Sequence, residues 1–388
     1  MNLHEFQAKA ILERRGVPVP VGQVAWTADE AAAIATEIGG TRFAVKAQIL
    51  AGGRGAVGGV KIANSVDEVR RSAASMLGAK LVTAQTGAAG RSVRRVYIEE
   101  AVQCRRELYV GLLIDRNEGR IALIGTAEGG DMIEDRLRSD PESLQRLHFD
   151  GIEPPTQSEL RRFAESLGIE AGLADQAAEL FAALARAFVE LDASLIEVNP
   201  LCVSEGGRLL ALDVKMAIDD NSLFRQPELQ GLRDEDETDA IELEAQRHDL
   251  NFVRMDGNIG VIVNGAGLAL ATHDILRDAG GAPANFMDIR TTARSQQIAK
   301  GIGLLLADAS VKVILVNVHG GGMTSCDTIV DAIQMAMRSS GRKVPIVFRA
   351  AGQNADHARR LMADRRVPNE IADDMSAAAR RAVALAKG

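Results

Sequence analysis

The chain has 388 residues, of which 46% are hydrophobic and 25% charged, and its formal net charge is −8. This length suggests two or three domains with sizeable cores, and the acidic balance argues against nucleic-acid binding, for which basic domains are typical. Because no apolar run reaches the roughly 18 residues that cross a bilayer and the polar N-terminus has no signal-peptide pattern, we expect a cytoplasmic protein that does not bind membranes.

The N-terminal half is predicted to contain runs of strands separated by helices. An amphipathic helix ends at Gly16, a second covers 29–38, and a strand at 43–49 leads into a glycine-rich loop at 51–59. The other predicted elements are strands at 60–63, 93–102, 107–115, 120–127, 194–203 and 208–218 and helices at 157–167 and 174–190. Because strands follow strands with turn residues between them, antiparallel pairing and an α+β fold are favoured.

Acidic residues concentrate between the two halves, with seven acids among residues 234–244. Such a charge run is typical of a solvated linker, so we predict domains at 1–240 and 241–388. Beyond it, short apolar strands are each followed by a loop and a helix-like segment. These strands are predicted at 259–263, 284–289, 311–318, 344–349 and 367–371. The alternation predicts an α/β domain with a doubly wound parallel sheet.

Soft metal ligands are scattered along the chain. Cys104, Cys202 and Cys326 are odd in number and far apart, and the six histidines show no metal-ligand spacing. The sequence therefore predicts neither a disulfide framework nor a cysteine-based zinc site.

The glycine-rich loop contains a G-x-G-x-x-G pattern from Gly53 to Gly58. A dinucleotide fingerprint must open a helix, but a strand-like run follows here, and the loop also lacks the G-x-x-x-x-G-K-[ST] sequence. A glycine loop between two strands can still cover a triphosphate, because backbone N–H groups approach phosphates closely where no Cβ intervenes. Lys46 on the preceding strand can add a positive charge. A mobile hairpin that binds nothing is the alternative.

Polar residues recur at every second position on two predicted strands near residue 200. Glu197 and Asn199 share one strand face, and Asp213 begins the same spacing on the next strand, so strand pairing brings Asn199 and Asp213 together. Carboxylate and amide oxygens are ligands that Mg²⁺ accepts. Glu99 and Glu107 flank another strand pair and are candidates for ribose or base contacts. Solvated polar strand positions are the alternative for each of these residues.

Several motifs together resemble one family, the β subunits of succinate–CoA ligase. They occur in the family's order and spacing and cover almost the whole chain. The motifs are His4–Lys9, Val45–Gln48, Ala51–Gly59, Glu107–Tyr109, Glu197–Leu201, Leu212–Lys215, Leu223–Leu229 and Asp256–Ala269. The chain is also similar to malate–CoA ligase β subunits and to the corresponding parts of citryl-CoA synthetase and ATP-citrate lyase.

The resemblance implies an ATP-grasp region at 1–240, followed by a flavodoxin-like CoA-ligase domain at 241–388. It also implies a role for each residue that matches a family motif. The implied residues are Lys46, Gly53, Arg54, Gly55, Glu99, Val102 and Glu107 for ATP; Asn199 and Asp213 for Mg²⁺; Glu197 for a partner's phosphorylated histidine; and Asn264, Gly321, Gly322 and Met323 for the carboxylate substrate and phosphoryl group.

The implied reaction joins a carboxylate to CoA at the expense of ATP, giving ADP, phosphate and acyl-CoA. It proceeds through a phosphohistidine on an α subunit and an acyl phosphate, with CoA held mainly by that partner in an αβ or α2β2 assembly. The route is chemically reasonable because a carboxylate accepts a thiolate poorly until its oxygen carries a better leaving group. Phosphoryl transfer itself needs mostly positioning and charge neutralisation.

Two loops depart from the family pattern. Arg290-Thr291-Thr292 stands where the family has glycines, and the loop from His319 to Ser325 is one residue longer. The resemblance therefore predicts ATP use and a dicarboxylate substrate, either succinate or a substituted acid such as malate. His319 itself is more typical of a hydrogen-bonding loop residue than of a phosphorylated one.

Two other functions remain compatible with the sequence. The chain could be an ATP-grasp ligase of a carboxylase or amide-forming type, although the five predicted C-terminal strands argue against this. It could also be a degenerate regulatory subunit that has lost phosphoryl transfer, although Lys46, Asn199 and Asp213 are retained.

Overall fold

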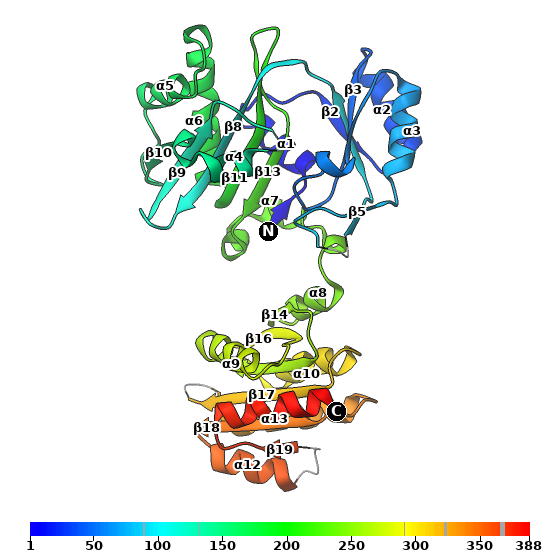
Figure 1. Cartoon of the computed structure of the whole chain (residues 1–388), viewed down its shortest axis with the longest axis vertical. Coiled ribbons are helices and arrows are strands. Elements are labelled where there is room, and N and C mark those ends of the chain that lie inside the picture. The colour runs from blue at the N-terminus through cyan, green and yellow to red at the C-terminus, as the bar shows by residue number, and fades with distance from the viewer. Residues whose placement is uncertain (88–89, 131, 291, 322–323, 365–368) are drawn as a thin grey trace. The chain divides into compact units, whose positions relative to one another are not determined.

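The computed structural model describes residues 1–87, 90–130, 132–290, 292–321, 324–364 and 369–388. They form two compact units, Met1–Glu237 and Thr238–Gly388 (Figure 1). The sequence predicts the division after residue 240, and the structure places it between Glu237 and Thr238. Among the described residues, no helix combines the length and apolar character needed to traverse a bilayer.

A four-stranded antiparallel sheet occupies the first part of the N-terminal unit. Its strands, in the order β2-β7-β3-β4, are β2 (Gly22–Ala25), β7 (Val96–Glu100), β3 (Phe43–Ala47) and β4 (Val60–Ala63). Helices α2 (Ala28–Ile38) and α3 (Val66–Met76) pack on one face of this sheet (Figure 1). The side chains of Thr27 and Ser65 cap these helices, as expected for hydroxyl residues at helix N-termini.

A larger antiparallel sheet forms the rest of this unit. It follows the order β1-β13-β11-β8-β9-β10, with β12 paired to β11. Its strands are β1 (Asn2–Leu3), β8 (Cys104–Asp115), β9 (Arg120–Thr126), β10 (Gln145–Phe149), β11 (Ala193–Ser204), β12 (Leu209–Ala211) and β13 (Val214–Ile218). Helices α1 (Glu5–Glu13), α5 (Gln157–Ser166) and α6 (Ala174–Glu190) share its hydrophobic core. The predicted strand at 208–218 is thus two strands, interrupted at Leu212 and Asp213.

Short elements complete the unit. They are β5 (Lys80–Leu81), β6 (Arg91–Ser92), α4 (Ile133–Ser139) and α7 (Pro227–Gln230), together with 3-10 turns at Gly55–Val57, Pro141–Ser143, Ala171–Leu173, Asp220–Arg225 and Glu235–Glu237. The sequence did not predict these elements, nor β1, β10 and α3. The predicted helix over the first 16 residues is correspondingly shorter, because residues 2–3 pair with β13 instead.

The cysteine prediction is wrong for one pair. Cys104 and Cys202 form a disulfide, with their Cα atoms 5.5 Å apart, whereas Cys326 is buried and reduced. Although 98 residues separate the pair, β8 and β11 are antiparallel neighbours whose register places Ser204 opposite Cys104. The pairing depends on this register, which cysteine spacing along the chain does not reveal.

The C-terminal unit is built on a six-stranded sheet with the order β14-β16-β15-β17-β18-β19. The strands are β14 (Asn251–Arg254), β15 (Ile259–Asn264), β16 (Asn285–Ile289), β17 (Val313–Gly320), β18 (Ile346–Gly352) and β19 (Asn369–Ile371). All neighbours are parallel except β14, which runs antiparallel to β16. The five parallel strands have the flavodoxin-like order 2-1-3-4-5, which confirms the predicted fold class. Val367, in the last predicted strand, lies outside the described residues.

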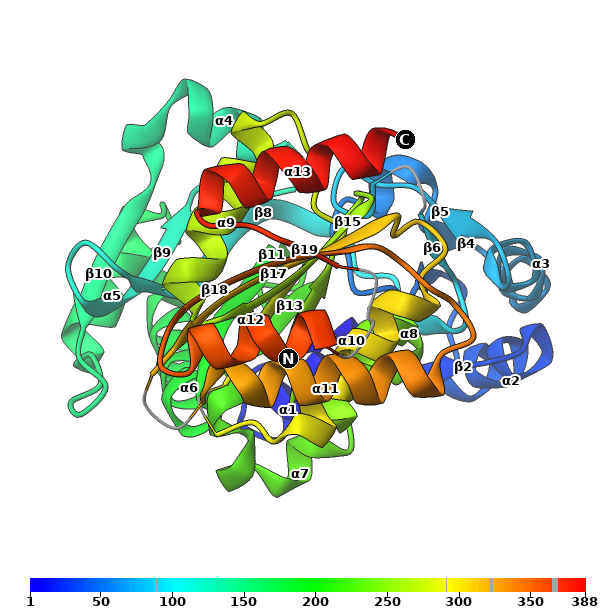
Figure 2. The ribbon, with the colours of Figure 1, turned by 90° about the horizontal axis from the view of Figure 1, so that it is seen from below.

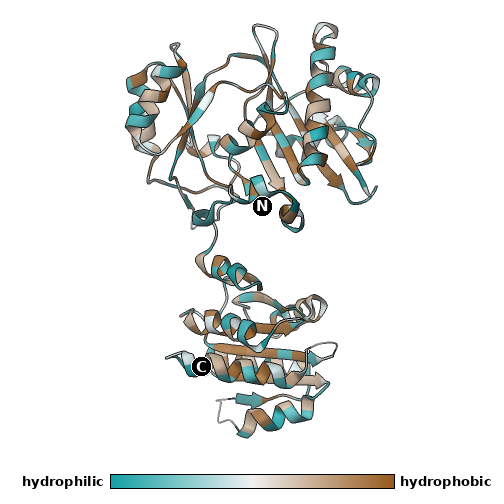
Figure 3. Ribbon diagram, turned by 180° about the vertical axis from the view of Figure 1, so that it is seen from behind, coloured by the Kyte–Doolittle hydropathy of each residue, from teal (hydrophilic) through white to brown (hydrophobic). Residues whose placement is uncertain are grey.

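Helices cover both faces of this sheet (Figure 2). One face carries α9 (Ala266–Asp278) and α13 (Met375–Lys387), and the other carries α10 (Ser295–Ala307), α11 (Cys326–Ser339) and α12 (Ala355–Asp364). Helix α8 (Ala240–Arg247) packs beside β14. The buried strands are mostly brown in Figure 3, whereas the helices mix brown and teal, as expected for a sheet covered on both sides.

Candidate functional site

A cavity of about 650 Å³ lies in the N-terminal unit and is lined by residues of both of its main sheets. The connection from β7 to β8, which contains Val102, crosses between the sheets and forms part of the wall. All predicted nucleotide, metal and histidine-orienting residues of this unit line the same cavity: Lys46, Gly53, Arg54, Gly55, Glu99, Val102, Glu107, Glu197, Asn199 and Asp213. Residues separated by up to 167 positions are therefore brought together.

Lys46 enters the cavity wall from β3, whose alternate residues face the hydrophobic core of the small sheet. Its ammonium nitrogen lies 2.9 Å from Glu5 Oε1 and 2.6 Å from Glu99 Oε1. It also donates a hydrogen bond of 2.6 Å to the carbonyl of Leu212, where the predicted strand is interrupted. Lys46 is thus held by both sheets and by α1.

Arg54 projects from the glycine-rich loop into the same group of charges. Its Nη2 donates to Glu5 Oε2 at 2.7 Å and to both oxygens of Asp213, at 2.9 and 2.8 Å, while Nη1 donates to the carbonyl of Ala47. Gly53, immediately before it, has φ = 70°, a conformation that glycine adopts at little cost. The loop therefore needs glycine for its path as well as for close backbone approach.

Burial and charge act in opposite directions on these groups. Burial would raise the pKa of Glu5, but the positive charges of Lys46, Lys9 and Arg54 outweigh it and hold this pKa well below its ordinary value. Burial would lower the pKa of Lys46, but Glu5, Glu99 and Asp213 raise it above its ordinary value. The carboxylate of Glu5 and the ammonium of Lys46 are therefore both charged at neutral pH.

Asn199 and Asp213 lie beside each other, as the strand pairing predicts. The backbone N–H of Asn199 donates to the carbonyl of Asp213 at 3.0 Å. Asn199 Oδ1 accepts a hydrogen bond of 2.7 Å from the Gly130 N–H, and the Asp213 carboxylate is paired with Arg54. An amide oxygen and a carboxylate from adjacent strands form a donor set that fits Mg²⁺, which takes oxygen ligands and retains waters and phosphate oxygens.

Sequence reasoning missed Glu5 and Lys9 as members of this site. Both stand one helical turn apart on α1 and are almost completely buried, at 4% and 1% exposure. Lys9 Nζ lies 3.1 Å from Glu5 and 2.5 Å from Glu99 Oε2. Their spacing would also suit a solvated ion pair on a helix surface. Only their position within the resembling motif His4–Lys9 distinguished them in the sequence.

In the C-terminal unit, the predicted substrate-side residues lie at the carboxyl ends of parallel strands. Asn264, at the end of β15, donates from Nδ2 to the His319 carbonyl at 2.7 Å, and its Oδ1 accepts from the His319 N–H at 2.8 Å. Gly321 follows β17, while Gly322 and Met323 lie outside the described residues. Ligands of doubly wound sheets bind at this edge.

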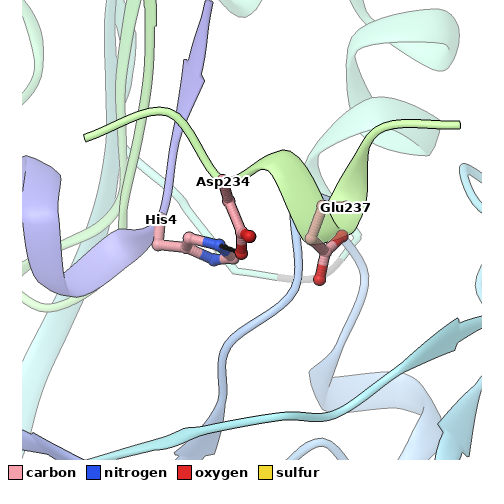
Figure 4. A group of neighbouring side chains, drawn as sticks. All are labelled: His4, Asp234 and Glu237. Atoms are coloured by element: carbon pink, nitrogen blue, oxygen red, sulfur yellow. Dashed lines mark hydrogen bonds and ion pairs between the residues drawn. The ribbon is translucent and has the colours of Figure 1, made fainter. Parts of the chain in front are cut away.

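A second group of titratable side chains lies at the end of the N-terminal unit (Figure 4). One side-chain nitrogen or oxygen atom of each residue, His4, Asp234 and Glu237, lies within 4.8 Å of the other two, a spacing that could suit a metal ion. His4 Nε2 is 2.7 Å from Asp234 Oδ2. That oxygen also pairs with Arg95, and Glu237 accepts a hydrogen bond from the Leu50 N–H. Because Arg95 already neutralises Asp234, the group is an ion pair with hydrogen-bonded neighbours, and it links the last turn of the unit to the start of α1 and to Leu50, just before the glycine-rich loop.

This cluster predicts a loss of stability in mild acid. Burial lowers the pKa of His4, more than the hydrogen bond to Asp234 raises it, and Arg95 lowers it further. The folded state therefore binds the His4 proton more weakly than the unfolded chain, so the stabilisation is complete above about pH 6.5 and is lost as the pH falls through the lower folded value. Thermal unfolding from pH 7.5 to 5 should show a steeper fall for the wild type than for His4→Gln. Equal slopes would contradict the assignment.

Comparisons with known proteins agree with this architecture. Residues 2–203 match the ATP-grasp domain family, and residues 262–387 match the CoA-ligase family. The chain is 43% identical over 387 residues to the succinate–CoA ligase (ADP-forming) subunit beta of Bordetella petrii, with both chains covered completely. It is 42% identical over 396 residues to the protein of the same name from Paramagnetospirillum magneticum, covering 100% of this chain and 99% of that one.

A solved structure of ATP citrate lyase from Methanothrix soehngenii, in complex with citrate and coenzyme A, superposes with a TM-score of 0.76. The match covers 99% of each chain at 17% identity, so it concerns the fold alone. The identity of 42–43% to the two relatives extends over the full length of the chain. The chain therefore belongs to the family of succinate–CoA ligase β subunits, with an ATP-grasp domain followed by a CoA-ligase domain.

Proposed function

We propose that the chain is the β subunit of an ADP-forming acid–CoA ligase that binds MgATP and phosphorylates a histidine of a partner α subunit. The observation that carries this proposal is that Lys46 and Arg54 line the same cavity as Asn199 and Asp213, the proposed oxygen ligands of the metal. The full-length relatives named succinate–CoA ligase support the same reaction. We also propose that the partner holds most of the CoA site in an αβ or α2β2 assembly.

In this proposal, the cavity acts mainly by positioning charge. Lys46, Arg54 and the backbone N–H groups of Gly53 and Gly55 bind the phosphates. Asn199 and Asp213 would hold Mg²⁺, whose positive charge would help to neutralise the transferred phosphoryl group. Four further residues line the cavity wall. In this proposal Glu99, Val102 and Glu107 contact the nucleotide, and Glu197 orients the partner's imidazole.

The decisive experiment is transfer of ³²P from γ-labelled ATP to the α-type partner chain of the same organism, followed by acid-labile phosphate analysis. Transfer to histidine supports the ligase, whereas ATP binding without transfer supports the regulatory-subunit alternative. Lys46 and Asp213 are both present and belong to one hydrogen-bonded network, in which Glu5 contacts Lys46 and Arg54 contacts both Glu5 and Asp213. Their presence favours a catalytic chain.

For the acid, we propose a substituted dicarboxylate such as malate over succinate. Arg290 is exposed at the end of β16, next to the carboxyl edge that carries Asn264. Thr291 lies outside the described residues. A guanidinium suits bidentate carboxylate binding, and hydroxyls suit a more polar acid, whereas three glycines would offer neither. Asn264, Gly321, Gly322 and Met323 would face the same acid and its phosphoryl group.

Replacing Arg290, Thr291 and Thr292 by glycines should therefore shift the order of kcat/KM over a panel of C4–C6 dicarboxylates towards succinate, by about tenfold, the value of one lost polar contact to a charged group. Arg277→Gly, in α9 of the same unit, serves as a matched control. An unchanged order with succinate first would instead indicate that Arg290 contacts the partner subunit.

A further inference from the structure

The cavity contains a closed set of charges that includes two residues of α1. Three cations, Lys9, Lys46 and Arg54, meet three carboxylates, Glu5, Glu99 and Asp213, through contacts of 2.5 to 3.1 Å. The sum of these charges is zero. Buried charges are found paired and hydrogen-bonded in this way, so each charge of the network has a partner of opposite sign in the absence of nucleotide.

Glu5 joins the two proposed phosphate-binding cations through opposite oxygens of its carboxylate. Oε1 lies 2.9 Å from Lys46 Nζ, and Oε2 accepts from Arg54 Nη2 at 2.7 Å. Gln48 Nε2 donates to Oε2 as well, at 3.2 Å. The carboxylate plane therefore fixes the separation between the ammonium of β3 and the guanidinium of the glycine-rich loop.

The exposure of the two carboxylates that contact Arg54 differs sharply. The side chain of Asp213 is 35% exposed, whereas that of Glu5 is 1% exposed. The Asp213 carboxylate is thus accessible to a metal ion in the cavity, whereas the Glu5 carboxylate contacts the two cations on their buried side. A buried anion would repel phosphate, so Glu5 cannot act as a direct phosphate ligand.

Glu5 also links the two parts of the N-terminal unit. Helix α1 packs in the core of the large sheet through Ala8, Ile11 and Leu12, and the strand just before it pairs with β13. Its carboxylate nevertheless contacts Lys46 of the small sheet. Through Glu5, α1 therefore holds Lys46 and Arg54 at a fixed position relative to the large sheet, near which the proposed metal ligands lie.

We infer that Glu5 is a positioning residue that sets Lys46 and Arg54 at the spacing required by the nucleotide's β- and γ-phosphates. This inference rests on the proposed function, because it takes these two cations as the phosphate ligands. It predicts that Glu5 contributes to recognition of the triphosphate and not to recognition of the adenosine moiety.

The test is Glu5→Asp, which keeps the charge but shortens the reach by one methylene, so the carboxylate can no longer bridge both cations. Calorimetric titration of the chain alone should show the ratio of ATP to AMP affinity falling by about tenfold, the size expected for a lost supporting contact to a ligand-binding group. Glu13→Gln, an exposed change on the same helix, should leave the ratio unchanged. An unchanged ratio in Glu5→Asp would overturn the inference, as would equal losses for ATP and AMP, which a merely structural role would produce.

A double variant separates position from charge balance. Glu5→Gln with Lys9→Met removes one charge of each sign, so the network stays neutral and thermal stability should be largely retained. The ATP to AMP ratio and the rate of ³²P transfer to the partner should both remain low, and recovery of either to the wild-type value would overturn the inference. Because the affinity ratio needs no partner, it decides the role of Glu5 even if the wild type transfers no phosphate, a result that would refute the proposed function alone.

Discussion

Asp213→Asn should lower the rate of phosphoryl transfer from ATP to the partner by about 100-fold or more, the range seen when one electrostatic contact to a transferred group is removed. The change is isosteric, yet it removes a negative charge from the proposed metal site and one of the two oxygens that accept from Arg54 Nη2. Single-turnover transfer of ³²P with saturating MgATP measures the effect directly.

The same change should have little effect on folding. Arg54 keeps the Glu5 carboxylate and the Ala47 carbonyl as acceptors, so we expect the midpoint of thermal unfolding to fall by only about 2–4 °C, equivalent to about 1 kcal/mol. Asp115→Asn is the matched control, because Asp115 is on β8 of the same sheet and pairs with His148. Wild-type transfer by Asp213→Asn would refute the metal assignment.

The purified chain alone should bind MgATP yet form no detectable acyl-CoA. All the nucleotide-side candidates line one cavity within its first unit, whereas the proposed histidine carrier and most of the CoA site belong to the partner. Equilibrium dialysis with labelled ATP and a thioester assay, each with and without the partner chain, separate the two properties.

Two outcomes would count against this division of labour. Robust thioester synthesis by the single chain would show that the carrier lies within it, with His319 the first residue to replace. Absence of MgATP binding by the single chain would show that the partner completes the nucleotide site. Lys46→Met provides the control for specific binding, because it removes the cation that Glu5 and Glu99 hold in the cavity wall.

The sequence predicted the C-terminal sheet well because its strands are short apolar runs that alternate with helices. It missed β14, in which only Phe252 is buried and the other residues are exposed. An edge strand of this kind carries little hydrophobic signal, and its pairing with β16 is a property of the folded sheet.

The site shows the same limit. Lys46, Asn199 and Asp213 could be proposed from residue type, spacing and family motifs, but Glu5 and Lys9 could not, because charged residues on a short helix usually face solvent. Their burial depends on contacts with Glu99 and Arg54, which lie up to 90 positions away. The Cys104–Cys202 pairing likewise depends on strand register, which residue spacing does not encode.

Strand β14 determines where the chain can be cut without causing aggregation. The CoA-ligase family match begins at residue 262, beyond β14 and inside β15. A fragment that starts there would lose half of β15 and leave one side of β16 without its antiparallel neighbour. Unpaired strand edges recruit the edges of other copies. A fragment that starts at Thr238 keeps α8 and β14, so it should remain dispersed where the shorter fragment precipitates.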